Sequence, residues 1–449
     1  MSLLKAIYQL PQNQNIWQNE DRVYNKQEVL SILSQIEQKG YQLRGKKIAI
    51  ASNNSISSLA LISYFSSIAK ELFLVPMDPK KDTIRHLLES ANSDIVVCDS
   101  ERTAEVFYGF STLTIDCQKH SAVKDTLKAI QNDRSNETVW KLATSGTTGI
   151  PKIFSHTIEG LSKTTKKSKP HKDNLIWGLV YSIERYAGLQ VFLQALYGSS
   201  KLVIASNLSI GQTTVLFDKS KVNCLSATPS LWRKLLMDNT FKTLEMSQVT
   251  LGGEIADQTL LNMLAKSFPK ARISHIYAST ELGVGFSVTD KMSGFPLSYL
   301  KAGYRGIDIR VINDRLYLKS SNLPKDRDSN QDGFYDTGDL VSIRNDRVIF
   351  LGRANGTINV GGNKVSPEKI ENLISSIPRV NEVVAKGRRS SVLGSIIECE
   401  IVADNDRDLA DLRKDIQKTC KMALAPFEVP AIIKFTKSLP ISRSGKLQR

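Results

Sequence analysis

The chain has 449 residues, about three times the ~150 residues of a typical domain, so we expect more than one domain. Its 41% hydrophobic and 23% charged residues are ordinary for globular proteins and argue against a mostly disordered chain. No uncharged apolar run approaches the ~18 residues of a membrane span, and the N-terminal residues lack the apolar core of a secretory signal. The five cysteines form no CxxC pair, so we expect a reduced, cytoplasmic protein without a disulfide framework or structural zinc.

The charge balance favours anionic partners. The 60 Lys and Arg residues exceed the 45 Asp and Glu residues and leave a net charge of +15. Such a field attracts nucleotides, nucleic acid, CoA or acidic proteins, although it also serves solubility alone. No recognition-helix, zinc-finger or paired-aromatic RNA-binding signature accompanies the charge, so no nucleic-acid partner is predicted.

Residues 26–130 alternate between helical periodicity and short apolar runs, which predicts βαβ units and a mainly parallel sheet covered by helices. The expected helices are 27–38, 59–70 and 82–91, and the expected strands are 47–51, 72–76 and 94–98. The same rhythm continues in strands 201–205 and 249–251 and helices 230–237 and 259–267. After residue 301 the pattern changes to short strands with Asn, Asp and Gly turns, and a compact α+β region is expected from about Ser366. The Gly- and Asn-rich stretch 352–362 predicts a linker between the two.

A loop rich in hydroxyls and glycine gives the strongest local signal. The two glycines allow backbone N–H groups to point inward, and the hydroxyls and a lysine add donors that suit a polyphosphate. The spacing is not that of a Walker loop, and a loop of this composition can also be an ordinary surface turn. Its candidate ligands are Thr144, Ser145, Gly146, Thr147, Thr148, Gly149 and Lys152.

Together with motifs that follow it in order, this loop resembles the signature of the adenylate-forming superfamily (acyl-CoA synthetases, adenylation domains and luciferases), in its acyl- or aryl-acid ligase branch. The resemblance extends over almost the whole chain. The motifs are Ala227-Thr-Pro-Ser230, Gly252-Gly-Glu254, Tyr277-Ala-Ser-Thr-Glu281, Tyr335-Asp-Thr-Gly-Asp339, Gly352-Arg353, Gly361-Gly362 with Val365-x-Pro367, and Ser444-Gly-Lys446. The family usually has glycine where this chain has Ala278.

The resemblance implies a nucleotide site. Tyr277 would stack on adenine, Asp339 would accept both ribose hydroxyls, and Arg353 would also contact the ribose. Small residues would let the purine pass. Read alone, Tyr277 suits a core position and Asp339 a turn. The full implied set is Gly253, Glu254, Tyr277, Ala278, Ser279, Asp339 and Arg353.

The resemblance also implies the catalytic groups, which are Lys446, Thr280, Glu281 and Lys152. Thr280 would bond the α-phosphate, and Glu281 would bind Mg²⁺, which prefers few carboxylates plus substrate phosphates. Lys446 resembles the mobile lysine that bonds the carboxylate and the α-phosphate. Without the resemblance it would be part of a frayed basic tail.

The implied reaction is ATP-dependent activation of a small carboxylic acid to acyl-AMP and pyrophosphate, followed by transfer to a thiol. The implied fold is α/β: a large N-terminal AMP-binding domain, residues 1–354, of helix-covered, mainly parallel sheets plus a small barrel-like β region, then a small mobile α+β domain, residues 355–449. The hinge would be Asn355, since asparagine tolerates unusual backbone angles. ATP, Mg²⁺ and a thiol co-substrate are the implied cofactors.

The region expected to bind the acid contains Tyr181, Arg185, Gly188 and Gly252. Residues 180–188 lack the Asp of the aromatic-Asp-x-Ser stretch by which amino-acid-activating members bind the α-ammonium, so an aryl or fatty acid is favoured. Arg185 either bonds a polar group on the acid or pairs with Glu184 or another carboxylate. An amino-acid adenylating enzyme and a non-catalytic nucleotide-binding relative remain the alternatives.

The thiol acceptor is CoA or the phosphopantetheine of an acyl carrier protein. Carrier proteins are typically acidic, so the net charge favours a carrier slightly over CoA. Two basic stretches, lysines within 163–172 and Arg388-Arg389, would meet an acidic protein, the phosphates of CoA, or only solvent. Neither the identity of the acid nor an oligomeric state is predicted.

Overall fold

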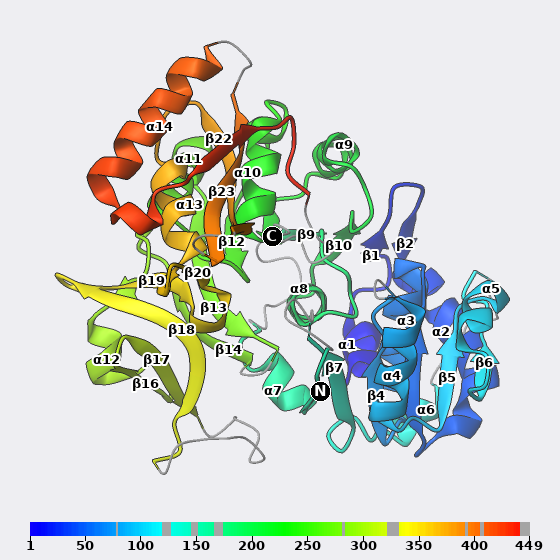
Figure 1. Ribbon diagram of the computed structural model, residues 1–449. Helices are drawn as coiled ribbons and strands as arrows, with labels where there is room; N and C mark the ends of the chain where they lie inside the picture. Colours follow the sequence, from blue (N-terminus) through cyan, green and yellow to red (C-terminus); the bar gives the residue numbers. More distant parts are fainter. Residues whose placement is uncertain are drawn as a thin grey trace. The chain divides into compact units, whose positions relative to one another are not determined.

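The computed structural model describes residues 1–77, 80–118, 127–144, 151–165, 174–280, 283–320, 332–390, 394–404 and 408–440 (Figure 1). The chain forms two compact units. The first contains Met1–Ser226, Leu244–Gln248 and Ser279–Gly283, and the second contains Ala227–Thr243, Val249–Ala278 and Val284–Arg449. These units do not coincide with the domains 1–354 and 355–449, and that division stays a prediction.

One sheet of the first unit has six strands in the order β6-β5-β3-β4-β7-β8. All neighbours are parallel except β7 and β8, which form an antiparallel pair. The buried sides of the strands are short runs of Ile, Val, Leu and Ala, as expected for a sheet covered by helices. The strands are β3 (Lys47–Ala51), β4 (Glu71–Leu74), β5 (Ile95–Cys98), β6 (Thr112–Thr114), β7 (Val139–Ala143) and β8 (Ile153–His156). The helices are α2 (Lys26–Gly40), α3 (Ser55–Phe65), α4 (Lys81–Ala91), α5 (Glu101–Ala104), α6 (Lys128–Gln131) and α7 (Ile158–Ser162).

The remaining strands of the first unit run in the order β11-β9-β10-β1-β2. β1 lies parallel to β10 and turns back into β2 as an antiparallel hairpin. The strands are β1 (Asn15–Gln18), β2 (Val23–Asn25), β9 (Ile176–Leu179), β10 (Lys201–Ile204) and β11 (Cys224–Ala227). The helices are α1 (Leu3–Gln9), α8 (Tyr186–Tyr197) and α9 (Ile210–Ser220).

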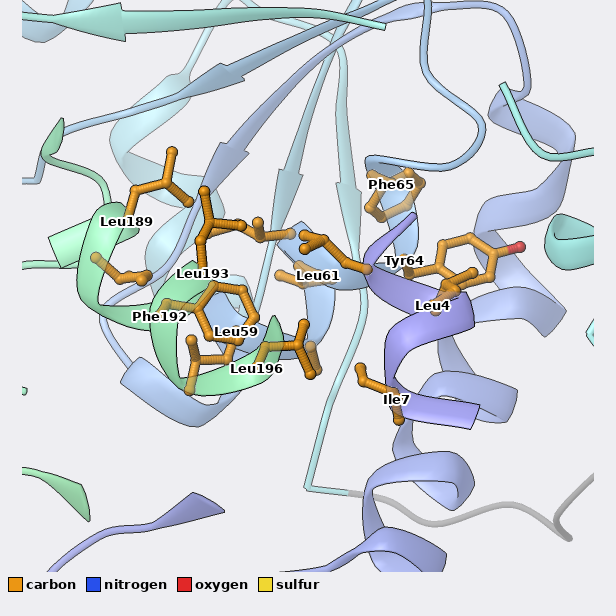
Figure 2. Packing of buried hydrophobic residues seen from close by; sticks show 14 of the residues in the cluster. Leu4, Ile7, Leu59, Leu61, Tyr64, Phe65, Leu189, Phe192, Leu193 and Leu196 are labelled. Atoms are coloured by element: carbon orange, nitrogen blue, oxygen red, sulfur yellow. The ribbon is translucent and has the colours of Figure 1, made fainter. Parts of the chain in front are cut away.

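A continuous hydrophobic core joins α1, α3 and α8 (Figure 2). Leu4 and Ile7 of α1, Leu59, Leu61, Tyr64 and Phe65 of α3, and Leu189, Phe192, Leu193 and Leu196 of α8 point into it, each at most 3% exposed. Full burial of such a side chain contributes roughly 1.5–3 kcal/mol. This packing fixes α8, and therefore the loop that precedes it, where Arg185 is the N-cap residue.

The second unit begins with α10 (Pro229–Met237), β12 (Gln248–Gly252), α11 (Gln258–Ser267), β13 (Arg272–Ser279) and β14 (Gly283–Val288), with the strands in the order β14-β13-β12. A five-stranded antiparallel sheet follows in the order β15-β19-β18-β17-β16. Its elements are β15 (Phe295–Pro296), α12 (Ser298–Ala302), β16 (Ile307–Ile312), β17 (Arg315–Ser320), β18 (Tyr335–Arg344) and β19 (Arg347–Arg353).

The last part of the second unit is a small α+β region with its own core. The two-stranded sheet β20 (Ile358–Val360) and β21 (Asn363–Val365) precedes α13 (Pro367–Ser375). A three-stranded sheet contains β22 (Val380–Ser390), β23 (Gly394–Ala403) and β24 (Ile432–Phe435), and α14 (Leu409–Ala423) packs with α13. Ile370, Ile401 and Ile416 are fully buried together in this core. The predicted fold class is confirmed: parallel sheets with helices, a curled antiparallel sheet and a C-terminal α+β region.

None of the helices in the described ranges combines the length and the apolar character that crossing a bilayer requires.

Candidate functional site

Asp339 is the centre of a polar cluster in the second unit. It lies on β18 directly opposite Arg353 on β19, and the Arg353 Nε lies 3.0 Å from Asp339 Oδ1. The Tyr277 hydroxyl, from β13, donates a hydrogen bond to Asp339 Oδ2. The sequence motifs therefore bring three of the predicted nucleotide ligands into direct contact.

The backbone before Asp339 explains why its motif contains glycine. Gly338 has φ +73°, a conformation that side-chain-bearing residues rarely adopt, and its N–H donates to Asp336 Oδ1 at 2.8 Å. Thr337 Oγ1 accepts from the Asp339 N–H at 3.1 Å and donates to the Leu316 carbonyl at 2.8 Å. A Cβ on Gly338 would meet open space, so backbone angle rather than crowding requires glycine here. The turn aims the Asp339 carboxylate at Tyr277 and Arg353.

The electrostatics of the cluster keep Tyr277 a hydrogen-bond donor. Burial raises the pKa of Tyr277 well above its ordinary value, and the negative charge of Asp339 raises it further. Burial also raises the pKa of Asp339, which is only 7% exposed, while Arg353 and the Tyr277 hydroxyl lower it. A carboxylate held this way has acceptor capacity for hydroxyl groups such as those of a ribose.

The Tyr277 ring already has aromatic partners. It lies nearly parallel to Phe286 of β14, with 5.0 Å between ring centroids, and nearly parallel to Phe350 of β19, with 5.3 Å. Gly285 permits this approach, because a Cβ there would lie 3.1 Å from Tyr277 Cδ1. The sequence motifs did not identify either phenylalanine. Stacking of adenine on Tyr277 stays a prediction, and Phe286 and Phe350 orient the ring that would provide it.

Two further motifs meet at the N-terminus of α10. Glu254 Oε2 accepts a hydrogen bond from the Ser230 N–H at 2.9 Å, and Thr228 is the N-cap residue whose side chain accepts from the Leu231 N–H. A carboxylate is stabilised at this position by the helix dipole and the unpaired amides. Gly253, with φ +81°, turns the chain between β12 and Glu254. The structure thus joins Ala227–Ser230 to Gly252–Glu254, and the contact of either with a nucleotide stays a prediction.

In the first unit, Thr144 and Lys152 close the base of the predicted phosphate loop. The Thr144 N–H donates to the Lys152 carbonyl at 2.9 Å, and the Lys152 N–H donates to Thr144 Oγ1 at 3.0 Å. These bonds extend the antiparallel pairing of β7 with β8. The predicted ligands between them, Ser145, Gly146, Thr147, Thr148 and Gly149, lie outside the described residues.

Arg185 is attached to the same loop base. Its Nη1 donates to the Thr144 carbonyl at 2.8 Å and lies 3.5 Å from the Ala143 carbonyl, and the residue is only 9% exposed. The Glu184 carboxylate accepts from Ser58 Oγ at 3.1 Å and from Ser182 Oγ at 2.5 Å. Burial raises the pKa of Glu184, whereas the two hydroxyls and the charge of Arg185 lower it.

These bonds add backbone partners to the two that the sequence offered for Arg185, a polar group on the acid or a paired carboxylate, and those two alternatives stay predictions. Two of its hydrogen bonds run to backbone carbonyls, and its charge also stabilises the Glu184 carboxylate. Backbone partners carry no sequence signature, which is why motif reading did not find them.

The other predicted pocket residues lie in different units. Tyr181, Arg185 and Gly188 belong to the first, and Gly252 belongs to the second. Tyr181 is 4% exposed, and a Cβ on Gly188 would lie 2.1 Å from the Ser182 carbonyl oxygen. The acid pocket itself stays a prediction.

For several predicted residues the structure does not test the predicted chemical role. Lys446 and Glu281 lie outside the described residues. Ala278 and Ser279 lie on β13, and Thr280 follows it. Asn355 lies in the short 3₁₀ turn Ala354–Gly356, as a hinge between β19 and β20 would. The roles of Lys446 in catalysis, Glu281 in Mg²⁺ binding and Asn355 as a hinge stay predictions.

Comparison with known families identifies the chain. The family described as AMP-binding enzyme matches residues 27–319, and the AMP-binding enzyme C-terminal domain matches residues 369–446. The chain belongs to the AMP-binding enzyme family. It is therefore a member of the adenylate-forming superfamily that the sequence motifs resembled.

Its relatives include acid–CoA ligases. This AMP-binding enzyme is 26% identical to the mitochondrial acyl-coenzyme A synthetase ACSM1 of Mus musculus over 360 residues, 68% of this chain and 60% of that protein. It is 21% identical to a 2-succinylbenzoate–CoA ligase of Staphylococcus aureus over 457 residues, 92% of this chain and 90% of that protein. The match to the mouse protein thus spans only about three fifths of that relative's length.

The fold is shared with solved structures. The o-succinylbenzoate CoA synthetase MenE of Bacillus subtilis, in complex with its acyl-adenylate intermediate, superimposes with a TM-score of 0.73. The sequence identity is 17%, and the match covers 100% of this chain and 96% of that one.

Proposed function

We propose that this AMP-binding enzyme activates an aryl or fatty acid with ATP to an acyl-AMP and pyrophosphate, and then transfers the acyl group to a phosphopantetheine thiol. The observation that carries the proposal is the contact of Tyr277, Asp339 and Arg353, which joins three nucleotide motifs of the family around one buried carboxylate. The names of the relatives support an acid and CoA as substrates.

In the first step an oxygen of the acid attacks the α-phosphorus of ATP. The new P–O bond forms as the bond to the β-phosphate breaks, and pyrophosphate leaves. In the second step the thiol loses its proton to solvent, its sulfur attacks the acyl carbon, and AMP leaves with the C–O electron pair. Negative charge develops on phosphate oxygens in the first step, so preorganised donors stabilise its transition state.

The chain's own groups divide this work. The Asp339 carboxylate would accept hydrogen bonds from the ribose hydroxyls, and Arg353 and Tyr277 would hold that carboxylate in place. The paired residues Thr144 and Lys152 would hold the two ends of the phosphate loop together, and Arg185 stabilises this pair by donating to the Thr144 carbonyl. Bound Mg²⁺ would neutralise phosphate charge, and Glu281 is the residue that we propose holds it.

CoA is the first candidate for the thiol acceptor, and an acidic carrier protein is the second. The net charge of +15 supports a carrier. The basic site at Arg388 gives the carrier less support. Arg388 Nη1 lies 3.0 Å from Glu398 Oε2 and Lys434 Nζ lies 2.9 Å from Glu398 Oε1, so this carboxylate partly neutralises both cations. The lysines from Lys166 to Lys172 lie outside the described residues.

The role of Lys446 is tested by separating the half-reactions. Lys446→Ala should lower acyl-AMP formation by ~10²-fold or more, since one preorganised charge at such a transition state commonly has that effect. Thioester formation from supplied acyl-AMP should be much less affected. The matched control is Lys437→Ala, which replaces an exposed lysine nine residues before Lys446 and should behave like the wild type. Equal losses in both half-reactions would contradict the assignment.

The acceptor is tested by competition. Equal thiol concentrations of CoA and of an acidic holo-carrier protein are offered to enzyme loaded with acyl-AMP, over a range of salt concentrations. Salt-insensitive transfer to CoA alone supports an acid–CoA ligase. Preferred transfer to the carrier that falls steeply as the Debye length shortens to ~10 Å near 0.1 M salt would favour the second candidate.

A further inference from the structure

Lys234 joins two parts of the second unit that lie far apart in the sequence. It stands in the last turn of α10, and its Nζ donates to the Leu439 carbonyl at 2.6 Å. The same Nζ lies 3.8 Å from Glu382 Oε1 on β22. Both elements are labelled in Figure 1. The side chain of Lys234 is 17% exposed and that of Glu382 is 5% exposed, so little water reaches the contact.

Leu439 is held from its other side by the C-terminal sheet. Its side chain is 2% exposed and packs with Val384 of β22 and Val402 of β23. Just before it, the Thr436 N–H donates to the Ile401 carbonyl at 2.9 Å. The segment 436–440 is therefore anchored to β22 and β23 by the Leu439 side chain and the Thr436 N–H, and to α10 by the Leu439 carbonyl.

Glu382 needs the cation that faces it. Burial raises the pKa of this carboxyl group, while Lys234, the backbone N–H of Leu439 and Arg233 lower it. Arg233 itself pairs with Asp257, so Lys234 is the cation directed at Glu382 and Leu439. Without Lys234, the Leu439 carbonyl would lose its hydrogen-bond donor and the buried Glu382 carboxylate would lose the positive charge that faces it.

The position of this contact relates it to the chemistry. Lys446 follows Leu439 by seven residues, which span at most about 23–25 Å when extended. Lys234 lies five residues after Pro229, about 7.5 Å along the helix axis. A fixed Leu439 therefore limits how far Lys446 can lie from α10.

We propose that Lys234 is a positioning residue for the adenylation step, which it serves by holding residues 436–440, the part of the chain that leads to Lys446. The inference rests on the proposed function, because it assigns Lys446 to adenylation. On this reading the contact between Lys234 and Leu439 serves the formation of acyl-AMP and not the formation of the thioester.

The half-reactions test the role. Lys234→Met should lower acid-dependent ATP–pyrophosphate exchange about 10- to 100-fold, the usual effect of removing a charged donor from a buried contact. Thioester formation from supplied acyl-AMP should change less than about twofold. Lys234→Arg should recover much of the exchange activity. Lys266→Met, an exposed lysine in the last turn of α11, is the matched control and should not change either step.

Equal loss in both steps, loss of the thioester step alone, or no loss would overturn the proposal. If Lys234→Met does not fold, the comparison of Lys234→Arg with Lys234→Gln decides, because arginine keeps a positive charge with donors for Glu382 and Leu439, whereas glutamine lacks the charge. The proposal then requires a selective fall in exchange for Lys234→Gln only.

A second readout does not depend on catalysis. Amide hydrogen exchange at residues 436–440 should be faster in Lys234→Met than in Lys266→Met, because the backbone anchor is gone. Unchanged protection would overturn the proposal even in an active enzyme. An inactive wild type in which the lysine variant still loosens 436–440 would instead refute the proposed function and retain the anchor.

Discussion

Replacing Arg185 by methionine removes a buried cation while keeping most of its length. The substitution leaves the Thr144 carbonyl without its 2.8 Å donor and the Glu184 carboxylate without a neighbouring positive charge. Charged hydrogen bonds of this kind contribute about 1.5–3 kcal/mol. At about 1.4 kcal/mol per factor of ten, this corresponds to an effect on the order of 10- to 100-fold.

The structure predicts which kinetic constant this substitution changes. Because Arg185 bonds the residue at which the phosphate loop begins, the KM for ATP should rise by most of this factor, and the KM for the acid should rise little. Steady-state exchange assays with one substrate saturating separate the two. Arg185→Lys should recover only part of the loss, since a single ammonium does not reproduce the guanidinium fork. Arg44→Met, at an exposed position, is the control.

The opposite pattern would refute the reasoning. If Arg185→Met left the KM for ATP unchanged and weakened a polar-substituted acid more than its unsubstituted analogue, Arg185 would bind the acid. The sequence left that role open.

Two other substitutions test the surroundings of the site. Tyr277→Phe removes the hydroxyl that lowers the pKa of Asp339, so this pKa should rise further, and the acidic limb of kcat/KM for ATP should move to higher pH. A profile that is unchanged or moves to lower pH would contradict the assigned hydrogen bond. Gly188→Ala should lower the melting temperature, because its Cβ would lie 2.1 Å from the Ser182 carbonyl and overpacking costs about 1–3 kcal/mol or more. Gly211→Ala, where a Cβ meets open space, should not lower it.

Local periodicity predicted the elements of the parallel sheets well. The strand expected at 47–51 is β3, and the helix expected at 82–91 is α4, because each has a continuous apolar face of the right period. The helix expected at 59–70 instead spans Ser55–Phe65: it begins earlier because Asn54 caps it by accepting from the Ser57 N–H, and it ends five residues before the predicted end. The pairing of β1 with β10 was not predictable, since a strand's partner 185 residues away leaves no local pattern.

The site was predictable to the extent that it consists of motifs. Tyr277, Asp339 and Arg353 were identified from motif order alone, and the structure shows them in contact. Phe286 and Phe350 were missed because their function is to pack against one ring, a role that any apolar strand residue can have. The partners of Arg185 and Lys234 were missed for a different reason: both donate to backbone carbonyls, and these are the same for every residue type.

The most direct test of the central claim is acid-dependent exchange of pyrophosphate into ATP, measured with a panel of aryl, fatty and amino acids. We predict exchange that requires a carboxylic acid, is supported by an aryl or fatty acid, and is followed by thioester formation when a phosphopantetheine thiol is added. Exchange supported by an amino acid and by no other member of the panel would contradict the account. Tight ATP binding without exchange for any acid in the panel would also contradict it, and would indicate a nucleotide-binding relative without catalysis.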